Sequence, residues 1–290
     1  MPELPEVETI RRDLTKVLVG KKITAVDVIN KSPIKGSAEQ FKKALLGNKI
    51  KQIERTGKLM MLDLSDDNFL LIHLKMTGQL IYRFDHKIIE GGHNLPVFKE
   101  NDLPTKYTWV IWKFNDGSQL YFNDMRKFGY LKIVGKKEKE AVVAKYGIEP
   151  LTKNFILANF KKVLDKRKTS IKAILLNQAL IAGIGNIYAD EICFAAGIHP
   201  GSFVAKMSEE DIKKVFNASE AILKKAITHK GTTFKDYVNP HGSKGNFSNF
   251  LKVYQRDGEK CLRCKKGIIT KNKTAGRGSH YCPVCQKMIK

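Results

Sequence analysis

The sequence has 290 residues, and its 52 Lys and Arg against 29 Asp and Glu give a formal net charge of +23. This excess predicts a polyanionic partner, because Lys and Arg that neutralise phosphates release condensed counterions, and the length suits two domains. No apolar run is long enough for a bilayer and the acidic start lacks a signal-peptide pattern, so we expect a cytoplasmic, nucleic-acid-associated protein; a ribosomal-type or membrane-surface protein is the alternative.

The first predicted helix covers residues 5–18. Pro5 suits the first helical position, and an apolar stripe recurs at helical spacing. The stripe consists of Val7, Ile10, Leu14 and Val17.

The residues before this helix offer a catalytic group. Met1-Pro2 favours removal of the initiator Met, which would leave Pro2 with a free secondary amine whose pKa lies well below that of a lysine. Such an amine can attack a sugar aldehyde carbon and form an iminium, with Glu3 and Glu6 as proton donors and acceptors. The alternative is structural, since acidic residues at a helix N-terminus also stabilise the helix macrodipole.

Residues 22–134 change to a strand pattern. Short segments rich in β-branched and aromatic residues predict a sandwich or barrel, and residues 115–118, NDGS, read as a hairpin turn. The predicted strands are residues 60–64, 69–74, 79–84, 107–114, 119–124 and 128–134. The charged residues 135–140 are expected to begin a linker.

After residue 149 the pattern becomes helical, and it predicts helices over residues 155–164, 170–181 and 186–196. A fourth helix is expected to start at Ser208, with Asp211 as its capping-box partner, and to end at Gly231. Residues 232–250 read as a loop rich in Gly, Ser and Asn.

The segment AGIGN, residues 182–186, separates two of these helices. It is no dinucleotide fingerprint, because no strand precedes it and the third Gly is missing. It is predicted to be a tight turn with Asn186 at the N-cap, where a helix N-terminus can bind phosphate. A plain glycine turn with a capping Asn is the alternative.

Four cysteines near the C-terminus predict a zinc site. Two CxxC pairs are separated by 17 residues, and four thiolates favour one tetrahedral, structural Zn²⁺ with no open position for catalysis. The pairs are Cys261 with Cys264 and Cys282 with Cys285. Residues 251–290 hold 11 Lys and Arg against 2 Asp and Glu, so this module is expected to clamp phosphates, with Arg277 in its central loop. Cys193 is expected to be a buried thiol.

Several segments together resemble the formamidopyrimidine-DNA glycosylases over essentially the whole chain. They are MPELPEVETIRR, GKLMMLDL, HLKMTGQL, DMRKFGYL, IAGIGNIYADEICFAAGIHP, KGTTFKDYV and the terminal CxxC…HYCPVCQ. One departure is that Met125 and Lys127 stand where many members have Pro and Arg, which should alter loop rigidity and one charge but not the reaction.

The resemblance implies an α+β, two-lobed monomer. Its N-terminal lobe, residues 1–134, would be a catalytic β-sandwich flanked by helices, joined by a linker, residues 135–149. The other lobe would hold a helix–two-turn–helix domain, residues 150–250, with a lesion-capping loop at about 232–247, and a β-hairpin zinc finger, residues 251–290.

The resemblance also implies roles for single residues. Pro2 would be the nucleophile at C1′ and Glu3 the acid, with Glu6 and Lys58 supporting the reaction. The residues implied to contact DNA are His73 and Lys172 near the lesion, Met76, Arg126 and Phe128 as fillers of the void left by the flipped base, and Asn186 and Arg277 as phosphate clamps.

The function implied is base-excision repair of damaged double-stranded DNA. The enzyme would remove oxidised purines such as 8-oxoguanine and formamidopyrimidines, then cut the strand by β,δ-elimination through a Schiff base on Pro2. One alternative is an endonuclease VIII-type glycosylase for oxidised pyrimidines. The other is a non-catalytic zinc-dependent DNA-binding protein, which leaves Pro2 and Glu3 unexplained.

Overall fold

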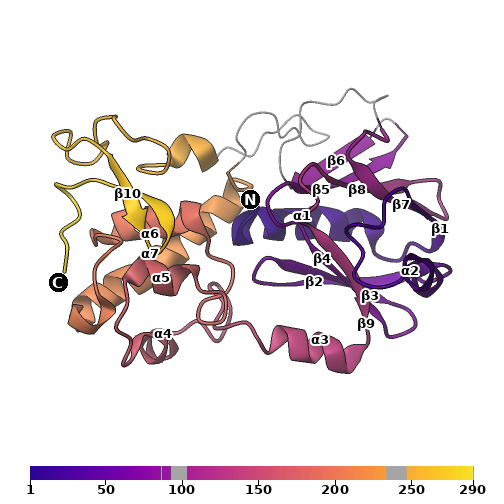
Figure 1. The fold of residues 1–290 in the computed structure, drawn as a ribbon, viewed down its shortest axis with the longest axis horizontal. Helices are drawn as coiled ribbons and strands as arrows, with labels where there is room; N and C mark the ends of the chain where they lie inside the picture. Colours follow the sequence, from indigo (N-terminus) through magenta and orange to yellow (C-terminus); the bar gives the residue numbers. More distant parts are fainter. Residues whose placement is uncertain (86, 93–102, 233–246, 290) are drawn as a thin grey trace. The chain divides into compact units, whose positions relative to one another are not determined.

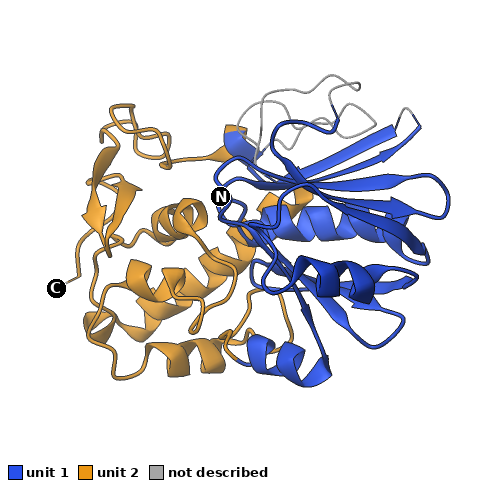
Figure 2. Ribbon diagram, turned by 45° about the vertical axis from the view of Figure 1, so that its right-hand side comes forward, with its two compact units in different colours: residues 1–144, 229–248 blue, residues 145–228, 249–290 orange. Residues whose placement is uncertain are grey.

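The computed structural model describes residues 1–85, 87–92, 103–232 and 247–289. The chain forms two compact units (Figure 2), one of Met1–Ala144 with His229–Ser248 and one of Lys145–Thr228 with Asn249–Lys290. Apart from its ends, Thr232 and Phe247, the predicted lesion-capping loop lies outside the described residues.

The first unit contains two antiparallel sheets that form the predicted sandwich (Figure 1). The five-stranded sheet has the order β1-β7-β8-β5-β6, with β1 (Ile23–Val28), β5 (Gly78–Phe84), β6 (Lys87–Gly92), β7 (Thr108–Phe114) and β8 (Gln119–Asp124). The four-stranded sheet has the order β2-β3-β4-β9, with β2 (Ile50–Thr56), β3 (Leu59–Leu64), β4 (Phe69–His73) and β9 (Tyr130–Val134). All six predicted strands are confirmed; β1, β2 and β6 were not predicted.

The predicted hairpin turn at residues 115–118 joins β7 to β8. The backbone N–H of Gly117 donates to the carbonyl of Phe114 at 3.0 Å, and Gly117 has φ 84°. Glycine suits this place because a side chain disfavours positive φ.

Two helices close the open edges of the sandwich. Helix α1 (Leu4–Leu18) contacts the edge strands β6 and β2, whereas α2 (Ala38–Leu45) contacts the opposite edges, β1 and β9. The inner faces of both sheets and the apolar stripe of α1 share one core, in which Leu14, Trp112 and Phe122 are almost completely buried. Burial of these large side chains holds the start of α1, and therefore the N-terminus, in a fixed place.

A further helix, α3 (Lys136–Val143), follows β9 in the charged stretch that was expected to begin a linker. None of its residues is buried. Five of its eight residues are charged, and the apolar residues Ala141, Val142 and Val143 are consecutive, so the helix has no apolar periodicity from which it could be predicted.

The second unit is helical, with a small zinc-finger hairpin. Its α-helices are α4 (Leu157–Leu164), α5 (Ile171–Leu176), α6 (Asn186–Ala196) and α7 (Glu209–Thr228), with a short 3-10 helix η2 (Val204–Lys206), and the hairpin is β10 (Thr270–Thr274) with β11 (Arg277–Tyr281). A second 3-10 helix, η3 (Phe247–Phe250), spans the boundary between the two units. Ser208 and Asp211 exchange hydrogen bonds at the start of α7, as predicted. Helix α5 ends earlier than expected, because Asn177 leaves the helical conformation and its side chain accepts from Ala179 N.

No helix among the described residues is long and apolar enough to cross a membrane.

Candidate functional site

The N-terminus places Pro2 beside two buried carboxylates. Helix α1 begins at Leu4, one residue before the predicted start, and Glu3 is its N-cap. The Glu3 side chain accepts from the backbone N–H of Glu6, while Glu6 Oε2 accepts from the backbone N–H of Glu3 at 2.9 Å. Pro2 is buried, and Glu3 and Glu6 are 2% and 9% exposed. The capping box therefore fixes both carboxylates directly after the candidate nucleophile.

The second oxygen of Glu6 holds a segment distant in the sequence. Glu6 Oε1 accepts from the backbone N–H of Thr232 at 2.7 Å and from the Thr232 hydroxyl at 3.0 Å. The preceding Gly231 has φ 80°, and a Cβ there would lie 2.6 Å from Glu6 Oε1. Only glycine therefore permits this approach, and Glu6 anchors the chain where the predicted capping loop begins. No pattern in the sequence predicted this contact.

Lys58 and His73 lie at one end of the four-stranded sheet. Lys58 is buried in the turn between β2 and β3, and its neighbour Leu59 pairs with His73 across β3 and β4. Burial, together with the charges of Lys75 and Lys58, lowers the pKa of His73 to about 3. The imidazole is therefore neutral at neutral pH, and its Nδ1 accepts the backbone N–H of Lys75 at 3.0 Å.

The three side chains expected to fill the void after base flipping are exposed. Met76 is 38% and Phe128 53% exposed, and the Arg126 guanidinium lies 4.6 Å from the centre of the Phe128 ring. As large apolar residues, Met76 and Phe128 would more often lie in the core of a sheet. They lie instead in the loops between β4 and β5 and between β8 and β9, which leaves them available to a ligand.

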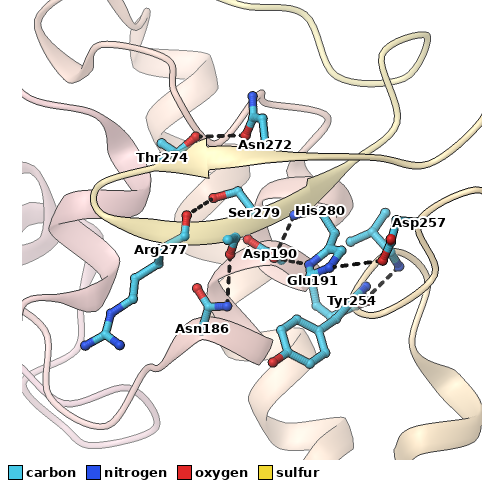
Figure 3. Close-up of polar contacts among 12 residues, drawn as sticks. Asn186, Asp190, Glu191, Tyr254, Asp257, Asn272, Thr274, Arg277, Ser279 and His280 are labelled. Carbon is cyan, nitrogen blue, oxygen red and sulfur yellow. Dashed lines mark hydrogen bonds and ion pairs between the residues drawn. The ribbon is translucent and has the colours of Figure 1, made fainter.

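Of the phosphate-clamp candidates, Arg277 belongs to the zinc-finger hairpin and Asn186 contacts it (Figure 3). Asn186 Nδ2 donates to the carbonyl of Gly278 at 3.0 Å, and Arg277 is an exposed residue at the start of β11. The prediction of Asn186 as N-cap is wrong: Gly185 is the N-cap and Asn186 is the first residue of α6. The side chain of Asn186 is therefore used to hold the hairpin next to the helix N-terminus.

Lys172, which was predicted to contact DNA, has its side chain in the interior of the second unit. Its side chain is completely buried, and Nζ donates to Asp190 Oδ1 at 2.6 Å, to the carbonyl of Gly278 at 2.9 Å and to Ser279 Oγ at 2.7 Å. These bonds use all three ammonium hydrogens. Lys172 therefore anchors the hairpin to helices α5 and α6.

Two acidic residues of α6 that sequence reasoning missed complete this anchor (Figure 3). Asp190 Oδ2 accepts from the backbone N–H of His280 at 2.8 Å and lies 3.0 Å from its Nδ1. Glu191 is 1% exposed and accepts the backbone N–H groups of residues 252–254 at 2.9 to 3.0 Å. The signal that could have identified them is an adjacent acidic pair in a largely apolar helix, because buried carboxylates need hydrogen-bond partners.

The four predicted zinc ligands come together. Their sulfur atoms all lie within 4.8 Å of one another; Cys261 Sγ is 3.8 Å from Cys285 Sγ, and Cys264 Sγ is 3.7 Å from Cys282 Sγ. A tetrahedral Zn²⁺ with Zn–S bonds of about 2.3 Å requires sulfur separations of about 3.8 Å, so the site fits one zinc. Cys193 is a separate, completely buried thiol whose pKa is raised by burial, as expected.

Replacing one zinc ligand tests whether the metal is needed for DNA binding. In Cys282→Ser we expect loss of the bound zinc and a fall of about tenfold or more in affinity for duplex DNA, because the hairpin with Arg277 folds around the metal. Metal analysis and fluorescence anisotropy measure the two effects. Cys193→Ala is the control and should retain one zinc; full zinc content in Cys282→Ser would contradict the ligand assignment.

Comparison with protein-family models identifies three segments. The Formamidopyrimidine-DNA glycosylase N-terminal domain matches residues 1–131, the Formamidopyrimidine-DNA glycosylase H2TH domain matches residues 146–238, and the zinc finger found in FPG and IleRS matches residues 258–287.

Relatives that match the full length of the chain belong to the same family as the three matching models. Formamidopyrimidine-DNA glycosylases of Pelotomaculum thermopropionicum and Listeria innocua are each 38% identical, covering 99% of this chain and 100% of theirs. A mutant of Lactococcus lactis FPG in complex with Fapy-dG-containing DNA is 37% identical, with a TM-score of 0.85, and covers 99% of this chain and 100% of that chain. The Lactococcus lactis Fpg complexed with abasic-site DNA has the same identity and TM-score, and covers 98% of this chain and 99% of that chain.

Proposed function

Because the chain belongs to the formamidopyrimidine-DNA glycosylase family and is a base-excision-repair glycosylase and AP lyase, we propose that it removes oxidised purines through an iminium on Pro2. The observation that carries the proposal is the buried N-terminal cluster of Pro2, Glu3 and Glu6. Removal of Met1 is required, since the amide nitrogen that Met1 leaves on Pro2 is not nucleophilic.

In the proposed reaction the Pro2 nitrogen attacks C1′ of the damaged nucleotide, and the bond from C1′ to the base breaks. Glu3 supplies the proton that the sugar or the leaving base needs as this bond breaks. Opening of the sugar gives an iminium between Pro2 and C1′. Loss of a proton from C2′ then expels the 3′ phosphate, a second elimination expels the 5′ phosphate, and hydrolysis of the remaining imine frees Pro2.

The surrounding residues have supporting roles in this proposal. Glu6 accepts and returns protons while it holds Thr232, and the Lys58 ammonium lies near the reacting sugar and its phosphate, beside a neutral His73. Met76, Arg126 and Phe128 occupy the space that the flipped nucleotide leaves in the stack. Zinc takes no part in the chemistry, since four thiolates leave it no open position.

Asn186 and Arg277 are proposed to bind the DNA backbone. Asn186 begins α6, and the backbone N–H groups and the positive end of the helix dipole at a helix N-terminus suit a phosphate. The cytoplasm, at the nucleoid, is the proposed location, because chromosomal DNA is the proposed substrate, and the enzyme is proposed to act as a monomer.

Salt dependence tests the phosphate role of Arg277. Arg277→Ala should weaken binding to damaged and undamaged duplexes alike and lower the slope of log affinity against log salt by about 1, since one phosphate contact is lost. Lys43→Ala, on the exposed side of α2, serves as the charge-matched control and should leave the slope unchanged. A loss confined to one base sequence would contradict a backbone contact.

A panel of duplexes tests the proposed substrate class. We expect rapid excision of 8-oxoguanine and formamidopyrimidine opposite cytosine, and no excision from an undamaged duplex. Preference for an oxidised pyrimidine such as thymine glycol would instead place the enzyme with the endonuclease VIII-type glycosylases.

A further inference from the structure

The two loops that carry Met76, Arg126 and Phe128 are neighbours because of the sandwich topology. The β4–β5 loop passes from the four-stranded to the five-stranded sheet, and the β8–β9 loop passes back. His73 of β4 pairs with Tyr130 of β9, and Gly78 of β5 pairs with Asp124 of β8. The two loops are therefore next to each other at both of their ends.

A buried polar pair joins these loops. Thr77 and Asp124 are 4% and 0% exposed, and the Thr77 hydroxyl donates to Asp124 Oδ1. The backbone N–H of Arg126 donates to Thr77 Oγ1 at 3.0 Å and to Asp124 Oδ1 at 3.1 Å. Asp124 Oδ2 accepts from the backbone N–H of Gly129 at 2.6 Å. The Thr77 hydroxyl and the Asp124 carboxylate thus bind the backbone on both sides of Phe128. They connect that stretch of backbone to Thr77, the residue after Met76.

The two glycines beside the pair are closely packed. A Cβ on Gly129 would lie 2.8 Å from Phe122 Cζ and 3.0 Å from Asp124 Oδ2, and a Cβ on Gly78 would lie 2.4 Å from the carbonyl oxygen of Leu74. The indole N–H of Trp109 also donates to the Asp124 carbonyl at 2.6 Å. The polar pair is therefore a rigid base, from which only the three candidate void-filling side chains and their immediate neighbours reach the surface.

From this arrangement we propose that Thr77 and Asp124 are positioning residues for base extrusion, which make the two loops present Met76, Arg126 and Phe128 as one preformed wedge. The inference rests on the proposed function and extends it to residues that do not touch DNA. Its physical basis is that a preorganised binding element loses no conformational freedom when the duplex opens.

The test removes the hydroxyl while keeping the shape of the side chain. Thr77→Val should lower the single-turnover rate of 8-oxoguanine excision about tenfold, since it leaves the Arg126 N–H with one acceptor fewer and Asp124 with one donor fewer. Thr77→Ser, which restores the hydroxyl, should stay within about twofold of the wild type. Thr24→Val, at a surface threonine of β1, is the matched control and should have no effect. Thermal melting confirms that each variant is folded at the assay temperature. Asp124→Asn, which keeps one oxygen acceptor where the carboxylate offers two, provides an independent second variant.

A double-mutant comparison separates positioning from general destabilisation. In a background of Met76→Ala with Phe128→Ala, Thr77→Val should cost less than about twofold, because residues that act through one another are not additive. An unchanged rate in Thr77→Val, or an equal loss in both backgrounds, would overturn the positioning role while the proposed function stands. If the Met76→Ala, Phe128→Ala background itself excised 8-oxoguanine at the wild-type rate, the void-filling function would fail, and the inference with it.

Discussion

Protein that retains Met1 is expected to lose at least about 10³-fold in strand cleavage and in borohydride trapping, as expected when a covalent nucleophile is removed. The reason is that Met1 converts the Pro2 amine into a tertiary amide, whose nitrogen lone pair is delocalised and cannot form an iminium. Intact-mass analysis determines the fraction of each preparation that has lost Met1.

The control for this experiment is the same protein after Met1 has been removed by methionine aminopeptidase. Activity should return in proportion to the free Pro2, and affinity for a duplex with an abasic-site analogue should be nearly equal in both forms. Cleavage at full rate by the protein that retains Met1 would show that another amine is the nucleophile, and Pro2 would lose its proposed role.

Glu3→Gln should separate the two halves of the reaction. We expect excision of 8-oxoguanine to fall by about 10³-fold, because loss of a general acid typically costs 10² to 10⁴. Trapping on a preformed abasic site should fall by less than about tenfold, since the open aldehyde reacts without expulsion of a base. The substitution keeps an oxygen that accepts the Glu6 N–H, so the N-cap of α1 is preserved.

The matched control for this prediction is Glu39→Gln, at an acidic residue in the first turn of α2. It removes the same charge near the N-terminus of another helix, outside the N-terminal cluster, and should leave both activities unchanged. Equal losses of excision and trapping in Glu3→Gln would indicate that Glu3 acts on the iminium chemistry as a whole rather than on base release.

Much of the sandwich could be predicted from the sequence, and the strands that were missed share a cause. β1, β2 and β6 are all edge strands. An edge strand carries charged and polar residues that discourage further pairing, which obscures the apolar alternation. In β2, for example, Ile50 and Ile53 are buried but Lys51 and Gln52 are exposed.

Prediction of the site was limited by contacts between distant residues. The zinc ligands and the N-terminal carboxylates are local motifs with fixed spacing, so these residues could be singled out from the sequence alone. The role of Lys172 depends on Gly278 and Ser279, 106 and 107 residues later, and no pattern near Lys172 distinguishes a buried ammonium from one that faces DNA. The Glu6–Thr232 contact spans 226 residues and was equally invisible.

The zinc-finger hairpin is held in position by a buried hydrogen-bond network as well as by the zinc ligands. Lys172, Asp190 and Asn186 all bind residues of β11 that follow Arg277, so helices α5 and α6 determine the position of the hairpin together with the metal. If Arg277 binds phosphate as proposed, such support favours binding, because a long side chain on a mobile loop loses conformational entropy when it binds.

The central claim, that Pro2 is the nucleophile of a glycosylase for oxidised purines, is tested most directly by borohydride trapping on a duplex with one 8-oxoguanine opposite cytosine. Peptide mapping of the trapped complex should place the deoxyribose remnant on the nitrogen of Pro2, with strand cleavage only at the lesion and no adduct on the undamaged duplex. An adduct on a lysine such as Lys58, or no adduct on any damaged duplex, would contradict the claim.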